Sequence, residues 1–293
     1  MNWYRFASVV ALTIGLSFTS VVSAQARPSG ESETIRGINY RESEANLDQY
    51  ALDTCKLDLI HPPTRGYATV VWFHGGGLTG GEKEIPAALR GHDFAVAGVG
   101  YRLSPHVKSP VYIEDAAAAV AWTIKHIDQY GGDPQRVYLS GHSAGAYLAL
   151  MIALDKHWLA DRGVDADQLA GVISISAQAI THFTIRAERG IPNERTVIDE
   201  FAPVFHVRKD APPLLLLTGD REQELLGRYE ENAYLWRMLK LVGHPRVELK
   251  EIQGFDHGGV VGPGLDLLVK RLAADAKAKP SPTTAPATRP TNP

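Results

Sequence analysis

The five residues 141–145 constrain the fold of this chain most. They read Gly-His-Ser-Ala-Gly and place Ser143 between two glycines, after the apolar run 137–140 and before the helix-like run 147–152. A strand that turns this sharply into a helix leaves little room for side chains two residues before and after the serine, and glycine meets that requirement. The pattern therefore predicts a strand–turn–helix unit in which the hydroxyl of Ser143 projects above a sheet as a nucleophile.

Composition and charge narrow the class of protein. The chain of 293 residues is 44% hydrophobic and 22% charged, which is ordinary usage for a soluble globular domain. Its formal net charge of -3 provides no basic face for phosphate backbones, so we expect no nucleic-acid partner. Cys55 is the only cysteine, so no internal disulfide can form and stability must come from core packing.

The two ends differ in composition from the middle. Residues 1–24 are predicted to be a signal peptide, because Arg5 precedes the apolar stretch 7–22 and small residues follow. The alternative is a retained membrane anchor, for which this stretch is short. We expect a secreted or periplasmic protein without stable membrane insertion. Residues 279–293 are rich in Pro, Thr and Ala and predict a disordered tail, which leaves residues 33–276 as one catalytic domain.

Short strand-like runs alternate with longer helix-like runs inside this domain. The predicted strands are 35–40, 56–61, 68–73, 94–101, 136–140, 171–176, 214–218 and 247–252, and the predicted helices are 84–90, 112–129, 144–156, 228–242 and 264–274. The strands 68–73 and 214–218 are apolar without alternation, as in parallel sheets covered on both faces. The pattern predicts the α/β class, with a mostly parallel sheet of about eight strands flanked by helices and reactive loops at the strands' carboxyl ends.

A serine nucleophile needs a base, and the base needs a third group to hold it. His257 is the candidate base. It lies in the glycine-rich segment 254–259, between the last predicted strand and the last predicted helix, and it follows Ser143 in chain order. A histidine in a surface loop is the plain alternative, and this placement favours the base.

Three acidic residues follow the penultimate predicted strand: Asp220, Glu222 and Glu224. Asp220 is preferred as the third group, because it lies closest to the strand end and has the shorter, stiffer side chain. Glu222 and Glu224 are kept as alternatives. Asp256 adjoins His257, but neighbouring side chains in a loop usually diverge.

Residues 74–77, His-Gly-Gly-Gly, follow the buried strand 68–73. When an acyl carbon is attacked, its oxygen becomes an anion that needs fixed donors. The glycines let the backbone N–H groups of Gly76 and Gly77 approach that oxygen, with the N–H of Ala144 as a further donor. An ordinary strand-end turn is the alternative. His74 itself is expected to shape the loop.

Segments 74–77 and 141–145, followed late in the chain by His257, resemble the α/β-hydrolase fold. Within it they resemble esterases with a His-Gly-Gly-Gly loop, including hormone-sensitive-lipase-like carboxylesterases and feruloyl or acetyl-xylan esterase-like proteins. The similarity covers residues 35–274. It implies a serine carboxylic-ester hydrolase that forms an acyl-enzyme and acts on short-chain acyl esters, or on acetyl or feruloyl esters of polysaccharide.

Two departures from the family pattern concern the site. His142 precedes the serine where hormone-sensitive-lipase-like members usually have Asp, which favours the feruloyl-esterase-like or peptidase-like branches. Many relatives place their acid three residues after the glycine that ends the strand, which is Glu222 here. No cofactor is expected, and a catalytic metal is not expected because the histidines form no close ligand pair and lack a cysteine partner.

Other readings stay open. The resemblance extends to peptidases and arylformamidases, which cleave amides, and some relatives are non-catalytic binding proteins. The intact Ser143, His257 and segment 74–77 argue against the latter. Residues 177–213 lose their periodicity and form either a small cap over the pocket or a plain crossover. A small-molecule or polysaccharide-linked ester is the expected partner, and the sequence leaves the oligomeric state open.

Overall fold

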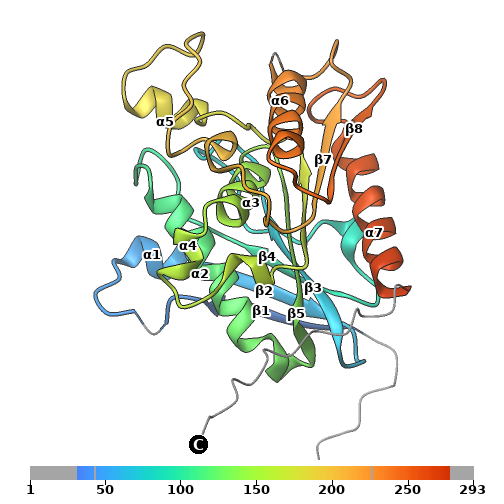
Figure 1. Ribbon diagram of the computed structural model, residues 1–293. Coiled ribbons are helices and arrows are strands. Elements are labelled where there is room, and N and C mark those ends of the chain that lie inside the picture. The colour runs from blue at the N-terminus through green and yellow to red at the C-terminus, as the bar shows by residue number, and fades with distance from the viewer. Residues whose placement is uncertain (1–31, 43, 226, 278–293) are drawn as a thin grey trace, which may run out of the picture.

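The fold is known from a computed structural model that describes residues 32–42, 44–225 and 227–277. The predicted signal peptide, 1–24, and the predicted tail, 279–293, lie outside these described residues. Between them the chain forms one central sheet with helices on both sides (Figure 1).

The sheet has eight strands in the order β1-β2-β4-β3-β5-β6-β7-β8. The strands are β1 (Glu33–Asn39), β2 (Lys56–His61), β3 (Tyr67–Phe73), β4 (Ala95–Val99), β5 (Gly132–His142), β6 (Gly171–Ile175), β7 (Leu214–Gly219) and β8 (Val247–Ile252). Strand β2 runs antiparallel to both β1 and β4, whereas β4, β3, β5, β6, β7 and β8 are parallel to one another. The predicted mostly parallel sheet of about eight strands is therefore confirmed.

Helices cover both faces of this sheet. They are α1 (Gln49–Thr54), α2 (Val111–His126), α3 (Ala144–Leu154), α4 (His157–Ala160), α5 (Phe183–Glu188), α6 (Arg228–Leu241) and α7 (Val261–Lys277), with short 3₁₀ turns η1 (Ala87–Leu89), η2 (Ile127–Tyr130), η3 (Ala166–Gln168) and η4 (Pro203–His206). Figure 1 shows α7 on one side of the sheet and α2 and α3 on the other. None of the helices in the described ranges is both long and apolar enough to span a bilayer.

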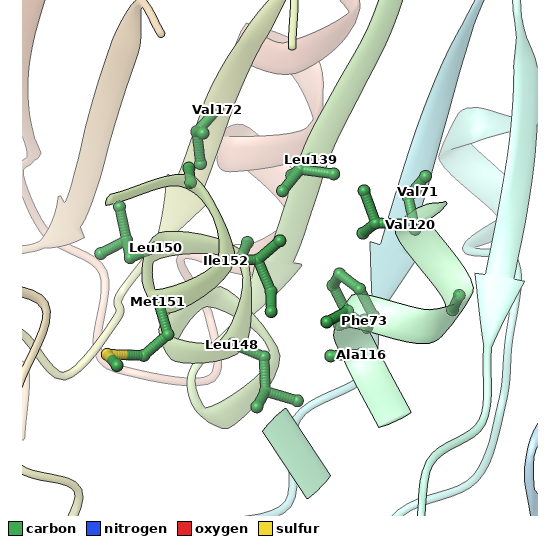
Figure 2. Close-up of a cluster of buried hydrophobic side chains, with 14 of the residues drawn as sticks. Val71, Phe73, Ala116, Val120, Leu139, Leu148, Leu150, Met151, Ile152 and Val172 are labelled. Atoms are coloured by element: carbon green, nitrogen blue, oxygen red, sulfur yellow. The ribbon is translucent and has the colours of Figure 1, made fainter. Parts of the chain in front are cut away.

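The core is divided between the two faces, because successive residues of a strand point to opposite sides. Along β3, Val71 and Phe73 pack with α2 and α3, whereas Val70 and Trp72 pack with α7. Every residue of α3 is buried, and Figure 2 shows its Leu148 and Ile152 close to Phe73 and Leu139. Burying apolar surface on both faces is what fixes β3 and β5, the strands that carry the loops of the site.

Some element boundaries differ from the prediction. The helix predicted at 84–90 is only the three-residue turn η1, because Pro86 restricts the residue before it and lacks an N–H. Strand β5 is longer than predicted and begins at Gly132. Helices α1, α4 and α5 were not predicted, since runs of six residues or fewer are too short for a periodic pattern.

Candidate active site

The predicted strand–turn–helix unit is present at Ser143. The residue lies between β5 and α3 with φ 53° and ψ -116°, a strained backbone conformation for a residue with a side chain. Its N–H donates to Ile175 O at 2.9 Å, and its carbonyl accepts from Tyr147 N at 2.9 Å. A Cβ on Gly145 would lie 2.1 Å from Phe73 O, so only glycine lets α3 pack this close to β3.

His257 lies where the base was expected, in the loop between β8 and α7. Its Nε2 is 2.9 Å from Ser143 Oγ, within hydrogen-bond range. Its Nδ1 is 2.6 Å from Glu224 Oε1. Because the Nδ1–H donates to the carboxylate, Nε2 is left as the acceptor that faces the serine hydroxyl. Ser143, His257 and Glu224 are thus brought together in one hydrogen-bonded series.

The preference for Asp220 as the third group is wrong. Its carboxylate accepts from the N–H groups of Gly254 at 2.8 Å and Glu222 at 3.0 Å, and so ties the loop together instead of reaching His257. Glu222 is exposed. The chain makes a helical turn here, in which Glu224 N donates to Asp220 O at 2.7 Å, and this turn brings Glu224 back against the sheet.

Glu224 is buried and saturated with donors. Its Oε1 accepts from Leu225 N at 2.9 Å as well as from His257, and its Oε2 accepts from Gly219 N at 3.1 Å and from Ser176 Oγ. Burial alone would raise the pKa of Glu224, but the hydrogen bonds from His257, Ser176 and Leu225 outweigh it and lower the pKa to about 2. The carboxylate is therefore ionised at neutral pH and holds the imidazole in one tautomer.

The loop after β3 lies against the serine. A Cβ on Gly75 would lie 3.6 Å from Ser143 Cβ, and Gly76 and Gly77 have φ values of 107° and 64°. Within the described residues, the N–H groups of Gly76, Gly77 and Ala144 donate to no protein acceptor. These three amides are therefore available to a ligand oxygen beside Ser143.

His74 holds this loop through a hydrogen bond and a ring contact. Its Nδ1–H donates to Gly75 O at 2.7 Å, and its ring stacks on Tyr101 with centroids 4.3 Å apart. Tyr101 OH donates to the His74 carbonyl at 2.7 Å. Burial lowers the pKa of His74, so the ring is neutral. These contacts agree with the structural part expected of His74.

His142 contacts His257, which the sequence did not reveal. Its Nε2–H donates to the carbonyl of His257 at 2.8 Å, and the two rings lie 4.6 Å apart. Burial, with a further contribution from the charge of His257, lowers the pKa of His142 to about 4. Only its position beside Ser143 could have drawn attention to it.

Hydrogen bonds between the loops continue the sheet beyond the ends of its strands. Ser143 N donates to Ile175 O at 2.9 Å, Ser176 N donates to Leu217 O at 2.7 Å, and Asp220 N donates to Phe255 O at 2.8 Å. Each loop that carries part of the site is thus bonded to the loop or strand end beside it. Ser176 adopts φ 52° while it contacts Glu224, which places a second strained serine at this edge.

The segment 177–213 contacts the glycine loop, which favours the cap over the plain crossover. The Phe183 ring lies so close to Gly77 that a Cβ there would be 2.9 Å from its Cζ. Thr184 Oγ1 donates to Gly77 O, and Phe183 N donates to Gln178 Oε1 at 2.9 Å. The helix α5 is therefore joined to the loop beside Ser143.

Comparisons with known proteins show what this chain is similar to. The BD-FAE family model matches residues 57–227, more than half of the chain. Esterase LipC of Mycobacterium tuberculosis is 25% identical over 219 residues, which cover 67% of this chain and 54% of LipC. Carboxylic ester hydrolase LipN of the same organism is 39% identical over 98 residues, 31% of this chain and 26% of LipN. The chain thus spans about half the length of LipC and about a quarter of LipN.

Solved structures share the fold. A truncated form of a carbohydrate esterase from gut microbiota matches with a TM-score of 0.69 at 16% identity, over 85% of this chain and 98% of that one. Esterase 2 of Thermogutta terrifontis, phosphoramylated by tabun, matches with a TM-score of 0.64 at 22% identity, over 88% of this chain and 99% of that one. The α/β-hydrolase fold expected from the sequence is confirmed.

Proposed function

This chain belongs to the BD-FAE family, and from that membership and the geometry of its site we propose that it is a serine carboxylic-ester hydrolase. The observation that carries the proposal is the hydrogen-bonded series from Ser143 through His257 to Glu224. A hydroxyl, an imidazole and a buried carboxylate in this order form the arrangement that activates a serine for acyl transfer.

The reaction follows from the geometry. His257 Nε2 takes the proton from Ser143 Oγ as the oxygen attacks the ester carbonyl, and the imidazolium then gives that proton to the leaving alcohol. Ser143 keeps the acyl group. A water molecule, deprotonated by the same Nε2, then attacks the acyl carbon. The bond from that carbon to Ser143 Oγ breaks, the imidazolium returns its proton to Oγ, and the carboxylic acid is released. Glu224 stays ionised throughout and stabilises the imidazolium.

The oxyanion that forms in each step needs donors that are already in place. The N–H groups of Gly76, Gly77 and Ala144 supply them: they have no protein acceptor among the described residues, Ala144 adjoins Ser143, and the loop that carries the two glycines lies against Ser143 at Gly75. Loss of one such donor typically reduces the rate by about 100- to 1000-fold. His74 and Thr184 position the loop by bonding its carbonyl groups, which leaves the amides for the ligand.

Short acyl groups or feruloyl and acetyl groups on polysaccharide are the proposed substrates, and the protein is proposed to act outside the cytoplasm. Two observations support the proposed substrates. The cap is small, and α5 lies directly on the glycine loop, which limits the room for long chains. A structural neighbour is described as a carbohydrate esterase.

Labelling by a fluorophosphonate tests the nucleophile without any assumption about the substrate. We expect the full chain to be labelled with one equivalent and Ser143→Ala to remain unlabelled. Ser140→Ala is the matched control, because Ser140 lies on β5 three residues before Ser143 and its hydroxyl donates to Ile173 O, so this variant should still be labelled. Equal labelling of wild type and Ser143→Ala would refute the proposal. Comparing 4-nitrophenyl acetate with 4-nitroacetanilide then separates ester from amide hydrolysis.

A further inference from the structure

The ring of Phe183 lies against the glycine loop that follows β3. A Cβ on Gly77 would be 2.9 Å from Phe183 Cζ and 3.5 Å from its Cε2, so the end of the ring touches the residue that carries one of the proposed oxyanion donors. A side chain at position 77 would take the space of the ring. Glycine at this position therefore lets an aromatic ring pack directly on the loop that is proposed to bind the oxyanion.

Hydrogen bonds on both sides of this ring fix the start of α5. Thr184 Oγ1 donates to Gly77 O, which joins the helix to the loop. Phe183 N donates to Gln178 Oε1 at 2.9 Å, which joins it to the segment that follows β6. Because its own main chain and the next side chain are both bonded, Phe183 has a defined place beside the loop.

A series of rings joins Phe183 to the helix that follows Ser143. The centroid of the His182 ring lies 4.4 Å from that of Phe183 and 5.0 Å from that of Tyr147. Tyr147 is in the first turn of α3, and its N–H donates to Ser143 O at 2.9 Å. The start of α5 thus contacts two elements that adjoin Ser143, the glycine loop and the first turn of α3.

Phe183 keeps a surface that a ligand can reach. It is partly exposed, whereas the residues around it in the chain, 181, 182 and 184–186, are buried. Ligand pockets are lined mainly by apolar and aromatic side chains around a few fixed polar groups. A partly exposed ring next to unpaired N–H groups meets that description.

The position of the base indicates which part of an ester would face this ring. A Cβ on Gly75 would lie 3.2 Å from His142 Nδ1, whereas His142 Nε2 donates to His257 O at 2.8 Å, so the glycine loop and the base contact different edges of one imidazole. The leaving alcohol must lie within reach of His257 Nε2 to receive its proton. The acyl chain then extends on the side of the glycine loop, where Phe183 lies.

We propose that Phe183 forms the end of the acyl-binding pocket and is the residue that restricts the substrate to short acyl groups. The inference rests on the proposed function, because it assigns the acyl specificity of the same site. A ring packed on Gly77 blocks the extension of an acyl chain past it. One methylene more or less in an apolar pocket changes kcat/KM by about 10- to 200-fold. Among the acyl groups proposed above, acetyl is therefore favoured over feruloyl.

A series of acyl lengths with one alcohol makes the test. We measure kcat/KM for 4-nitrophenyl acetate, butanoate and hexanoate, and expect the wild type to prefer acetate to hexanoate. Phe183→Ala should raise the hexanoate-to-acetate ratio by at least about 10-fold, and Phe183→Leu should raise it less. Phe183→Trp should lower the butanoate-to-acetate ratio. The same molecules hydrolyse both esters of a ratio, so the ratio does not depend on the fraction of protein that is folded.

Two controls separate the acyl side from the alcohol side, and the site from the rest of the segment 177–213. Ethyl acetate and hexyl acetate differ only in the alcohol, and their kcat/KM ratio, measured by pH-stat titration, should be the same in Phe183→Ala as in wild type. Phe205→Ala is the matched variant. Phe205 lies in the same segment, is 58% exposed, and its ring contacts that of His206 with centroids 5.1 Å apart. Both of its ratios should equal those of wild type.

The outcomes separate this inference from the proposed function. Acyl ratios within twofold of wild type in both Phe183→Ala and Phe183→Trp would overturn the inference and leave the proposed function intact. An alcohol ratio that shifts as much as the acyl ratio would also overturn it, because Phe183 would then face the leaving group. If Phe183→Ala fails to fold, Phe183→Leu and Phe183→Trp decide by the same threshold. If wild type hydrolyses none of the esters, the proposed function fails and the inference with it.

Discussion

His142 Nε2 donates a hydrogen bond to the backbone carbonyl of His257, 2.8 Å away, so the residue before the proposed nucleophile holds the main chain of the proposed base. Because burial lowers the pKa of His142 to about 4, the ring is neutral at working pH and the bond is unaffected by titration there. We therefore infer that His142 is a positioning residue, which acts through His257.

Replacing His142 tests this contact. His142→Leu should lower kcat by about 10-fold and change KM little, because it removes one hydrogen bond and leaves the His257 carbonyl unpaired. His142→Gln can still donate from its Nε2 and should recover most of the rate. The measurement is steady-state kinetics on 4-nitrophenyl acetate, with fluorophosphonate labelling rates for both variants. Equal rates for Leu and wild type would contradict the assignment.

Exchanging the acids identifies the third group. Glu224→Gln should reduce kcat by about three to four orders of magnitude, because the imidazole loses the group that fixes its tautomer. Asp220→Asn is the control, since Asp220 ties the loop to Gly254 and makes no contact with His257. It should retain activity within about 10-fold. A larger loss for Asp220→Asn than for Glu224→Gln would reverse the assignment.

The low pKa of Glu224 predicts acid sensitivity of the fold. The pKa is about 2 in the folded protein, below the ordinary value of 4.5 for a glutamate, so the unfolded chain binds the proton first as the pH falls. Glu224 therefore contributes stability above pH 4.5 that is lost between pH 4.5 and pH 2, with an upper bound of about 3 kcal/mol. Urea unfolding of wild type and Glu224→Gln at several pH values measures it. The difference between them should shrink below pH 4.5, and a constant difference would contradict this.

Gly145 cannot carry a side chain, because main-chain atoms of β3 and the loop after it lie too close. Gly145→Ala would place a Cβ 2.1 Å from Phe73 O and 2.5 Å from His74 O, both main-chain atoms that cannot move aside. We expect the variant to lose more than about 3 kcal/mol of stability or to accumulate unfolded. Gly262→Ala is the control, because nothing lies within 4 Å of a Cβ there and alanine favours helix. Urea unfolding of both variants checks the contrast.

Much of the fold and two members of the site could be predicted from residues whose pattern has one physical meaning. The buried strands follow from apolar runs. The turn at Ser143 and the placement of His257 follow from glycines at positions where a side chain would not fit or where a loop is expected. The acid could not be chosen, since three carboxylates in one loop have the same local pattern. The turn that joins Asp220 O to Glu224 N is accompanied by contacts of Glu224 with Gly219, the last residue of β7, and with Ser176, which follows β6 and is distant in sequence.

The cap and the burial of Arg228 could not be predicted from the sequence for a similar reason. Helix α5 has six residues, too few for a periodic signal, and its place is set by Phe183 and Thr184 on Gly77. An arginine such as Arg228 at a helix start predicts an exposed side chain. Only the packing of α6 against the end of β6 shows that the guanidinium is buried.

Main-chain hydrogen bonds join the loops at the edge of the sheet that carries the site. They run from Ser143 N to Ile175 O, from Ser176 N to Leu217 O and from Asp220 N to Phe255 O. Because main-chain bonds position these loops, the side chains of the site should keep their places when residues around them are substituted. We therefore expect substrate preference to change through residues outside these bonded loops, in the segment 177–213 and the first turn of α6. The reaction itself would stay the same.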